Sequence, residues 1–569
     1  MKKYVLILIL LMTGSVFAQT ASQRLQHIVD TVQSFDSYDR EEYPLGNYSE
    51  EIYKKEADFA RNRLDELKSI DIEELSETEK ISLELLRYKL QEDVDHYEYK
   101  AYLNPLLSDA GFHVSMPYHV RQLNNYPEVR QYLKKLRAFP LFVNQHLALL
   151  RAGIKEGIVQ PRVIFKGYES TYDDQIVEDP EKSYYFTPFL ELPPILTPEQ
   201  EDSVLLAARV VIQDKVIPEF RRIKRFFEEE YLPATRRSIG ISGIPGGREY
   251  YQNRLNYYTT LDLTPEEIHQ IGLGEVDRIN SEMKKIIEEV DFKGDFAAFL
   301  QFLRTDPRFY AKSGEALLKE ARDIAKRIDA QLPAFFKTLP RKPYGVAPVP
   351  AAIAPKYTTG RYIGASSDTQ AGYYWVNTYN LPNRPLYVLP ALTAHEAVPG
   401  HHLQISLNDE LGDSIPSFRR DFYLSAFGEG WGLYSETLAG EMGIYTTPYE
   451  RFGKLTYEQW RAVRLVVDTG IHAFGWTREE AVDFLRRNTA LSLHNINTEV
   501  DRYISWPGQA VSYKIGEMKI RELRRLAEET LGPDFDIREF HQVILGQGTV
   551  TLPIMEERVN KYIQEALRK

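Results

Sequence analysis

Apolar residues recur at three- and four-residue spacing through most of the chain, which is the period of an amphipathic α-helix. The pattern predicts helices within residues 22–99, 128–157, 198–231 and 263–290. A threonine cap followed by a proline and early acidic residues marks the start of the third of these segments, and the fourth begins in the same way.

The helical period is lost between residues 340 and 390, where prolines, glycines and aromatic residues replace it. Within this region, AGYYWVNTYN (371–380) has the β-branched and aromatic content of a strand. The period returns near residue 391 and continues to the end. We therefore predict a mainly α fold with a small β-sheet, whose 371–380 strand offers an edge to which an extended peptide can add.

Two further features divide the chain. Residues 1–18 carry two lysines, an apolar run and then small residues, which predicts a cleaved signal peptide. The run is shorter than the ~20 residues of a bilayer span, so we expect no stable membrane insertion after cleavage and a periplasmic or secreted protein. A Gly- and Ser-rich stretch at 235–250 predicts a boundary between an N-terminal helical domain (19–240) and a catalytic domain (241–569).

Composition narrows the possible partners. The 569 residues include no cysteine, so neither a disulfide nor a lipidated cysteine is available. The formal net charge is −12 and no dense Lys/Arg cluster offsets it, which argues against nucleic acid as a partner. The oligomeric state is left open.

The candidate chemistry begins at TAHEAVPGHHLQ. His395 and Glu396 start like the His-Glu-x-x-His helix of zinc peptidases, but the position of the second histidine is Pro399. Proline lacks an N–H, and its ring clashes with the carbonyl four residues earlier, which belongs to His395. A helix disruption therefore lies between the candidate ligands.

Two histidines compete for the second ligand position. On a straight helix His401 would lie roughly 120° away from the His395 face, whereas a bulge that absorbs two residues would return it to the one-turn position. His402 is nearly in phase without a bulge, but about 10 Å further along the axis. We favour His401 and keep His402 as the alternative.

The segment FGEGWGLYSE follows about thirty residues downstream. Glu429 is the candidate third ligand, and Glu436 falls on nearly the same helix face, where it could orient a ligand imidazole. Three glycines in this segment each cost a helix up to ~1 kcal/mol relative to alanine, which indicates that another group approaches the backbone closely.

These residues predict a Zn²⁺ site formed by His395, His401 and Glu429. Three protein ligands leave one position for water, and Glu396 would act as the general base that deprotonates it. The ligand set suits zinc without excluding manganese or cobalt.

Four ordered segments carry a family resemblance: TAHEAVPGHHLQ, EGWGLYSE, RLVVDTGIHAFGWT and WPGQAVSYKIG. Together they resemble the bacterial "domain of unknown function 885" family, whose members look like divergent zinc metallopeptidases of the gluzincin type. The resemblance implies a large multi-helix body with the small sheet bordering an active-site cleft. It also implies Glu429 as ligand and Glu436 as its support, as in the glutamate motif of zinc aminopeptidases.

Three further residues are candidates for contacts with substrate. His472, one helical turn from Asp468, could present an imidazole to substrate. Tyr513 could stabilise the oxyanion, because helical gluzincins similarly use a tyrosine from a late helix. Arg502 could hold a substrate carboxylate by a two-pronged contact.

The favoured interpretation is an exported zinc metallopeptidase that hydrolyses short peptides, of carboxypeptidase or oligopeptidase type. One alternative is a zinc amidase or esterase acting on a non-peptide substrate, for which the metal chemistry would be the same. The other is a catalytically inactive peptide-binding protein. The sequence determines neither the substrate nor the end from which a peptide would be cut.

Overall fold

The computed structural model describes residues 19–351, 354, 357–365 and 369–568. The predicted signal peptide lies outside these residues, so it stays a prediction. No helix within the described ranges is long and apolar enough to cross a membrane.

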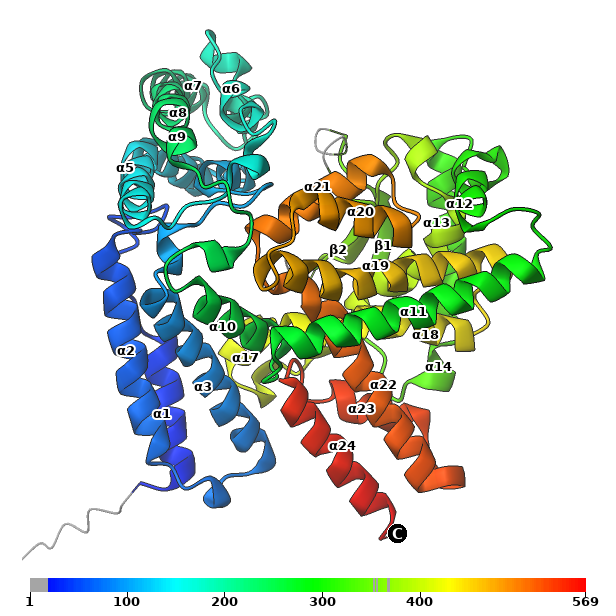
Figure 1. Cartoon of the computed structure of the whole chain (residues 1–569). Coiled ribbons are helices and arrows are strands. Elements are labelled where there is room, and N and C mark those ends of the chain that lie inside the picture. The colour runs from blue at the N-terminus through cyan, green and yellow to red at the C-terminus, as the bar shows by residue number, and fades with distance from the viewer. Residues whose placement is uncertain (1–18, 352–353, 355–356, 366–368, 569) are drawn as a thin grey trace, which may run out of the picture.

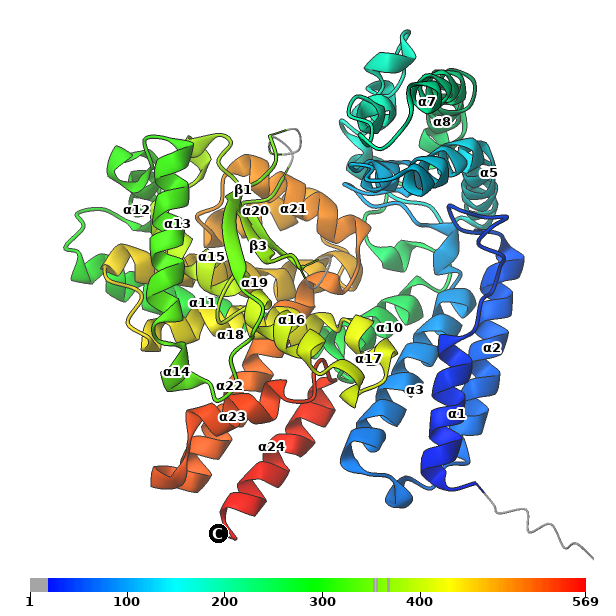
Figure 2. The same cartoon turned by 180° about the vertical axis from the view of Figure 1, so that it is seen from behind.

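Figures 1 and 2 show the N-terminal helices α1 to α3 side by side, with α5 and α7 to α9 gathered at one end of them. Threonine caps α7 as predicted: the Thr197 hydroxyl accepts from the backbone N–H of Gln200. The helices of this unit are α1 (Ala21–Gln33), α2 (Glu50–Lys68), α3 (Glu77–Glu98), α4 (Phe112–Ser115), α5 (Tyr126–Glu156), α6 (Ser170–Asp173), α7 (Pro198–Val211), α8 (Ile217–Phe226) and α9 (Leu232–Ala234).

The remaining helices form the larger part of the molecule, with α11 lying along α19 (Figure 1). They are α10 (Gly247–Thr259), α11 (Pro265–Glu289), α12 (Phe296–Thr305), α13 (Gly314–Asp329), α14 (Leu332–Phe335), α15 (Leu389–Glu396), α16 (His401–Glu410), α17 (Ser417–Asp421), α18 (Ser425–Glu441), α19 (Pro448–His472), α20 (Arg478–Asn488), α21 (Leu493–Ser505), α22 (Ser512–Leu531), α23 (Ile537–Leu545) and α24 (Leu552–Ala566).

Helix α19 is the centre of this part. Every residue from 461 to 472 is buried, because α11, α15, α18, α20, α21 and α22 all pack against it. A helix that is buried on all sides cannot follow the amphipathic pattern of a surface helix, and it makes a rigid support for side chains that project from it.

The sheet has three strands: β1 (Tyr344–Pro348), β2 (Gly360–Ile363) and β3 (Gly372–Val376). Their order is β1-β3-β2, with β1 parallel and β2 antiparallel to β3. The strand predicted within residues 371–380 is therefore the central one, and the expectation that it offers a free edge is wrong. Both of its edges are paired, and β2 is the edge strand that packs against α15.

The predicted fold class, mainly α with a small sheet, is confirmed. The predicted domain boundary at residue 240 falls between α9 and α10. One continuous cluster of buried apolar side chains includes residues from α1 through α24, so the two units share a core. The division into two domains stays a prediction.

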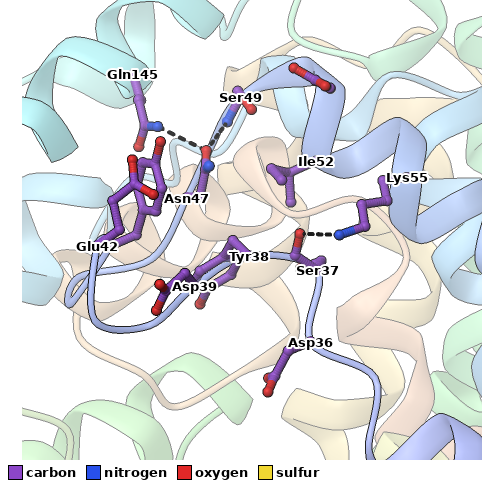
Figure 3. A pocket seen from close by; sticks show the side chains of 12 residues that line it. Asp36, Ser37, Tyr38, Asp39, Glu42, Asn47, Ser49, Ile52, Lys55 and Gln145 are labelled. Atoms are coloured by element: carbon purple, nitrogen blue, oxygen red, sulfur yellow. Dashed lines mark hydrogen bonds between the residues drawn. The ribbon is translucent and has the colours of Figure 1, made fainter.

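The N-terminal unit carries a surface pocket of about 820 Å³ (Figure 3). Its polar lining is largely engaged within the protein: Gln145 donates to Asn47 at 2.8 Å, and Lys55 donates to the carbonyl of Ser37 at 2.7 Å. None of the residues predicted to form the zinc site lines it.

Helices α18 and α22 cross with direct backbone contact. A Cβ on Gly430 would lie 2.6 Å from the carbonyl carbon of Gly516, and a Cβ on Gly516 would lie 1.9 Å from the carbonyl oxygen of Ala426. Glycine is therefore required on both sides of this crossing, because even a methyl group has no room between the helices.

We predict that Gly516→Ala lowers the free energy of unfolding by about 1–3 kcal/mol, because the added methyl group forces the two helices apart. Denaturant unfolding would measure the loss. Gly274→Ala is the matched control: Gly274 lies on an exposed face of α11 with open space around it, so alanine should leave stability unchanged or raise it by up to ~1 kcal/mol. Equal stability of the two variants would contradict the close crossing.

Candidate metal centre

Three side chains from three helices converge beside the sheet: His395 near the end of α15, His401 at the start of α16, and Glu429 in α18. Oε2 of Glu429 lies 3.4 Å from Nε2 of His395 and 3.5 Å from Nε2 of His401. Two ligands about 2.1 Å from a tetrahedral zinc ion lie about 3.4 Å apart. The three side chains are therefore spaced as ligands of one cation.

A turn of four residues, 397–400, separates the two histidines. The N–H of Gly400 donates to the carbonyl of Ala394 at 2.9 Å, and the indole N–H of Trp431 donates to the carbonyl of Pro399 at 2.8 Å. A Cβ on Gly400 would lie 1.9 Å from the carbonyl oxygen of His395, so glycine is required. The expected bulge within one helix is in fact a break between two helices, and it brings His401 back to His395.

His402 points away from this cluster. Its Nδ1 lies 3.0 Å from the hydroxyl of Tyr362 and 3.3 Å from that of Ser406. Burial lowers the pKa of His402 to about 4, so the ring is neutral at pH 7. His402, the alternative candidate for the second ligand, therefore links α16 to β2 and does not face the other candidate ligands.

Glu436 orients His395 from the opposite side. It is fully buried, and its Oε1 accepts from Nδ1 of His395 at 2.9 Å. The bond leaves Nε2 of His395 directed at Glu429, which is how carboxylates commonly orient metal-binding histidines. The guanidinium of Arg461 lies 3.6 Å from the same carboxylate oxygen.

The electrostatics of the cluster favour a positive charge. Burial alone would lower the pKa of His395, but the bonds with Glu429 and Glu436 and the charge of Glu396 raise it to about 10. Burial would raise the pKa of Glu429, yet His395 and His401 hold it well below its ordinary value. The field that favours an imidazolium here also favours a bound cation.

The glycines around Glu429 provide room for two rings. A Cβ on Gly432 would lie 2.7 Å from the His395 ring, and one on Gly428 would lie 2.4 Å from the Tyr423 ring. The close approach predicted for the three glycines is therefore made by site residues at Gly428 and Gly432, and by the backbone of Gly516 at Gly430.

Glu396, the last residue of α15, is half-buried and fixed by the sheet. Its Oε2 accepts from the backbone N–H of Tyr362 in β2 at 2.8 Å. The carboxylate is thereby placed at the junction between the edge strand and the His395 cluster.

Tyr423, which lies between α17 and α18, is a site residue that the sequence did not predict. Its hydroxyl donates to Oε1 of Glu429 at 3.1 Å, the oxygen opposite the one that faces both histidines. Although the residue is 46% exposed, desolvation and the Glu429 charge raise the pKa of Tyr423 well above its ordinary value. With 37 tyrosines in the chain, the only sequence signal for this one was Gly428, which leaves space for its ring.

Tyr513 lies in the first turn of α22 and is half-buried. The guanidinium carbon of Arg464 lies 4.5 Å from the centre of its ring, and that of Arg461 lies 6.0 Å away. Tyr513 is also among the groups that raise the pKa of Tyr423, so it belongs to the surroundings of the cluster.

The predicted catalytic role of His472 is wrong. Nδ1 of His472 accepts from the N–H of Ile241, and Nε2 donates to the carbonyl of Tyr503, each at 2.9 Å. The ring is fully buried, and desolvation lowers its pKa to about 3. Asp468 bonds to Tyr251 at 2.7 Å, and no bond joins it to His472 in the described structure. Backbone groups occupy both ring nitrogens, so His472 has a structural role.

The fold and site define a mainly helical protein with a buried His-His-Glu cluster at a helix break beside a small sheet. The chain belongs to the family "Bacterial protein of unknown function (DUF885)", whose model matches residues 33–559. No curated protein matches it.

Two solved structures share the fold over nearly the full chain. One is a "putative lipoprotein" from Colwellia psychrerythraea, which is 28% identical, with 96% of this chain and 97% of that chain covered and a TM-score of 0.86. The other is a "putative lipoprotein of unknown function" from Shewanella oneidensis, which is 18% identical, with 95% and 99% covered and a TM-score of 0.67.

We predict that the purified protein binds one equivalent of Zn²⁺ and that His395→Ala, His401→Ala and Glu429→Ala each abolish stoichiometric binding. Equilibrium dialysis followed by metal analysis would measure it. His402→Gln is the control and should retain the metal, because His402 faces Tyr362. Loss of zinc from the His402 variant with retention by the His401 variant would reverse the ligand assignment.

Proposed function

We propose that this chain is an exported zinc-dependent metallopeptidase, distantly related to the gluzincins, that hydrolyses short peptides. The observation that carries the proposal is the position of Glu396. Glu396, held by the Tyr362 N–H, directly follows His395 and its charge acts on that imidazole, which is one of three side chains spaced for one ion. A peptide-binding protein without activity would have no need of this group.

His395, His401 and Glu429 would hold the metal. Zinc in such a site lowers the pKa of a bound water and polarises a substrate carbonyl. Glu396 takes a proton from the attacking water and delivers it to the leaving amine as the amide C–N bond breaks. The bond from Tyr362 keeps one carboxylate oxygen of Glu396 engaged, which restricts the carboxylate to one orientation.

The two tyrosines take different roles. Tyr423 is a positioning residue: by donating to Oε1 of Glu429 it leaves Oε2 directed at the histidines. Tyr513 is the proposed donor to the oxyanion that develops on the substrate carbonyl. Loss of the Tyr423 hydroxyl should therefore weaken metal binding, whereas loss of the Tyr513 hydroxyl should not.

Substrate would lie along β2. This strand pairs only with β3 among the described strands, and its Tyr362 N–H points away from β3 to Glu396. A peptide would add by main-chain hydrogen bonds to the positions of this edge other than the Tyr362 N–H, which stays bonded to Glu396, and would pass Glu396 with little selection for its side chains.

Export is part of the proposal. The two similar structures carry the description of lipoproteins, a class of exported protein, and residues 1–18 have the composition of a signal peptide. Because these 569 residues contain no cysteine, a thioether-linked lipid is unavailable to them. We therefore propose a protein that is free in the periplasm or secreted.

Glu396→Gln should lower kcat on a short peptide by about 10³-fold while the protein keeps its zinc, because the amide cannot take the proton. Glu410→Gln, in the last turn of α16 and paired with Arg341, is the control and should keep full activity. Retained turnover by the Glu396 variant would count against the mechanism.

Tyr423→Phe and Tyr513→Phe should have different effects on zinc affinity and on kcat. We expect Tyr423→Phe to weaken zinc binding by about 10–100-fold, as other metal-supporting contacts do. Tyr513→Phe should leave zinc affinity unchanged and lower kcat by about 10²-fold. Metal titration and steady-state kinetics on both variants test this, and an exchange of the two effects would refute the assignment.

A further inference from the structure

Two arginines lie over the ring of Tyr513, and a third shares the carboxylate of Glu499 with one of them. Arg461 and Arg464 project from α19, and Arg502 comes from α21. Arg461 is 6% exposed and Arg464 is 3% exposed. Arginine is almost never so deeply buried unless anions pair with it.

The partners of these guanidinium groups are incomplete. Arg464 donates from Nε to the Tyr503 hydroxyl at 3.0 Å and from Nη2 to Glu499 at 3.2 Å, while its Nη1 has no partner among the described residues. Arg461 donates from Nη1 to the carbonyl of Tyr457 at 3.2 Å, and its Nε likewise lacks a partner there. Buried charged donors without acceptors are costly, so these groups favour the binding of an acceptor.

The charges around Tyr513 are unbalanced. Glu499 lies 3.2 Å from Arg464 and 3.7 Å from Arg502, so one carboxylate serves two arginines. The carboxylate nearest Arg461 is Glu436, which is already bonded to His395. Three guanidinium groups therefore outnumber the carboxylates near them, and an added anion would reduce the excess positive charge.

The nearby lysine does not share this surface. Lys514 is fully buried and bonds to Glu275, Glu458 and Glu517, each at 2.8 Å. Trp460, Tyr513, Glu499 and Arg502 are half-buried, so the arginine cluster borders solvent on that side.

The cluster is also joined to the candidate metal centre. Arg461 lies 3.6 Å from Glu436, and Glu436 in turn accepts from Nδ1 of His395 at 2.9 Å. The arginine cluster and the candidate metal centre therefore have Glu436 as a common neighbour.

We propose that Arg464, assisted by Arg461 and Arg502, binds the C-terminal carboxylate of the substrate, which makes the protein a carboxypeptidase. The inference rests on the proposed function and specifies its substrate class. A guanidinium presents two N–H donors in the plane of a carboxylate, and the half-buried Trp460 and Tyr513 supply apolar surface for the terminal side chain.

In the reaction, water adds OH to the acyl carbon of the scissile amide and a proton to its nitrogen. The products are a shortened peptide acid and the C-terminal fragment. Each residue beyond the scissile bond spans about 3.5 Å, so the length of the released fragment reports how far the arginines lie from the metal centre.

The test compares one peptide as its free acid and as its C-terminal amide. The zinc-loaded wild type should cleave the acid with a kcat/KM at least about 100-fold higher than the amide. Arg464→Gln should lower kcat/KM on the acid about 100-fold, mainly through KM, and leave the amide unchanged. Arg478→Gln is the matched control, because Arg478 pairs with Asp501 on the neighbouring helices and should leave the preference intact.

Binding to the Glu396→Gln variant keeps the two proposals separable. Selective binding of the acid without wild-type turnover would overturn the hydrolase and leave the arginine site standing. Equal turnover or equal binding of acid and amide would overturn the arginine site and leave the hydrolase standing. If Arg464→Gln does not fold, Arg502→Gln, at a half-buried position, takes its place. We expect this variant to lose at least a factor of about ten in its preference for the free acid over the amide. An unchanged preference would count against the site.

Discussion

The break between α15 and α16 is the constraint on which the candidate site depends. His395 and His401 are six residues apart, a spacing that no regular helix places on one face. The four-residue turn brings His401 back beside His395. The hydrogen bonds of Gly400 to Ala394 and of Trp431 to Pro399 hold the turn in place. Because Trp431 comes from α18, the helix that carries Glu429 also fixes the turn that positions His401.

Close packing that only glycine permits occurs at several other positions around the site. Gly432 makes room for the His395 ring, Gly428 for the Tyr423 ring, and Gly430 for the backbone of α22. Helix α18 can therefore contact α15, Tyr423 and α22 at once. A helix that carries so many glycines has low intrinsic stability, and the packing against its neighbours compensates for it.

Much of the fold could be predicted from the periodic pattern, because capped helices such as α7 are encoded locally. The sheet order could not, since β1 and β2 are short and contain glycine or proline, and their pairing is decided by contacts distant in sequence. Helical spacing likewise placed His472 one turn from Asp468 but could not reveal that the backbone of Ile241 and Tyr503 occupies its ring nitrogens. Tyr423 was missed for the same reason: its partner is known only from the fold.

The ligand geometry is most directly tested by anomalous diffraction at the zinc absorption edge from crystals of the zinc-loaded protein. We expect one peak about 2.0–2.2 Å from Nε2 of His395, Nε2 of His401 and a carboxylate oxygen of Glu429. A peak coordinated by His402, or no peak between these three residues, would contradict the account.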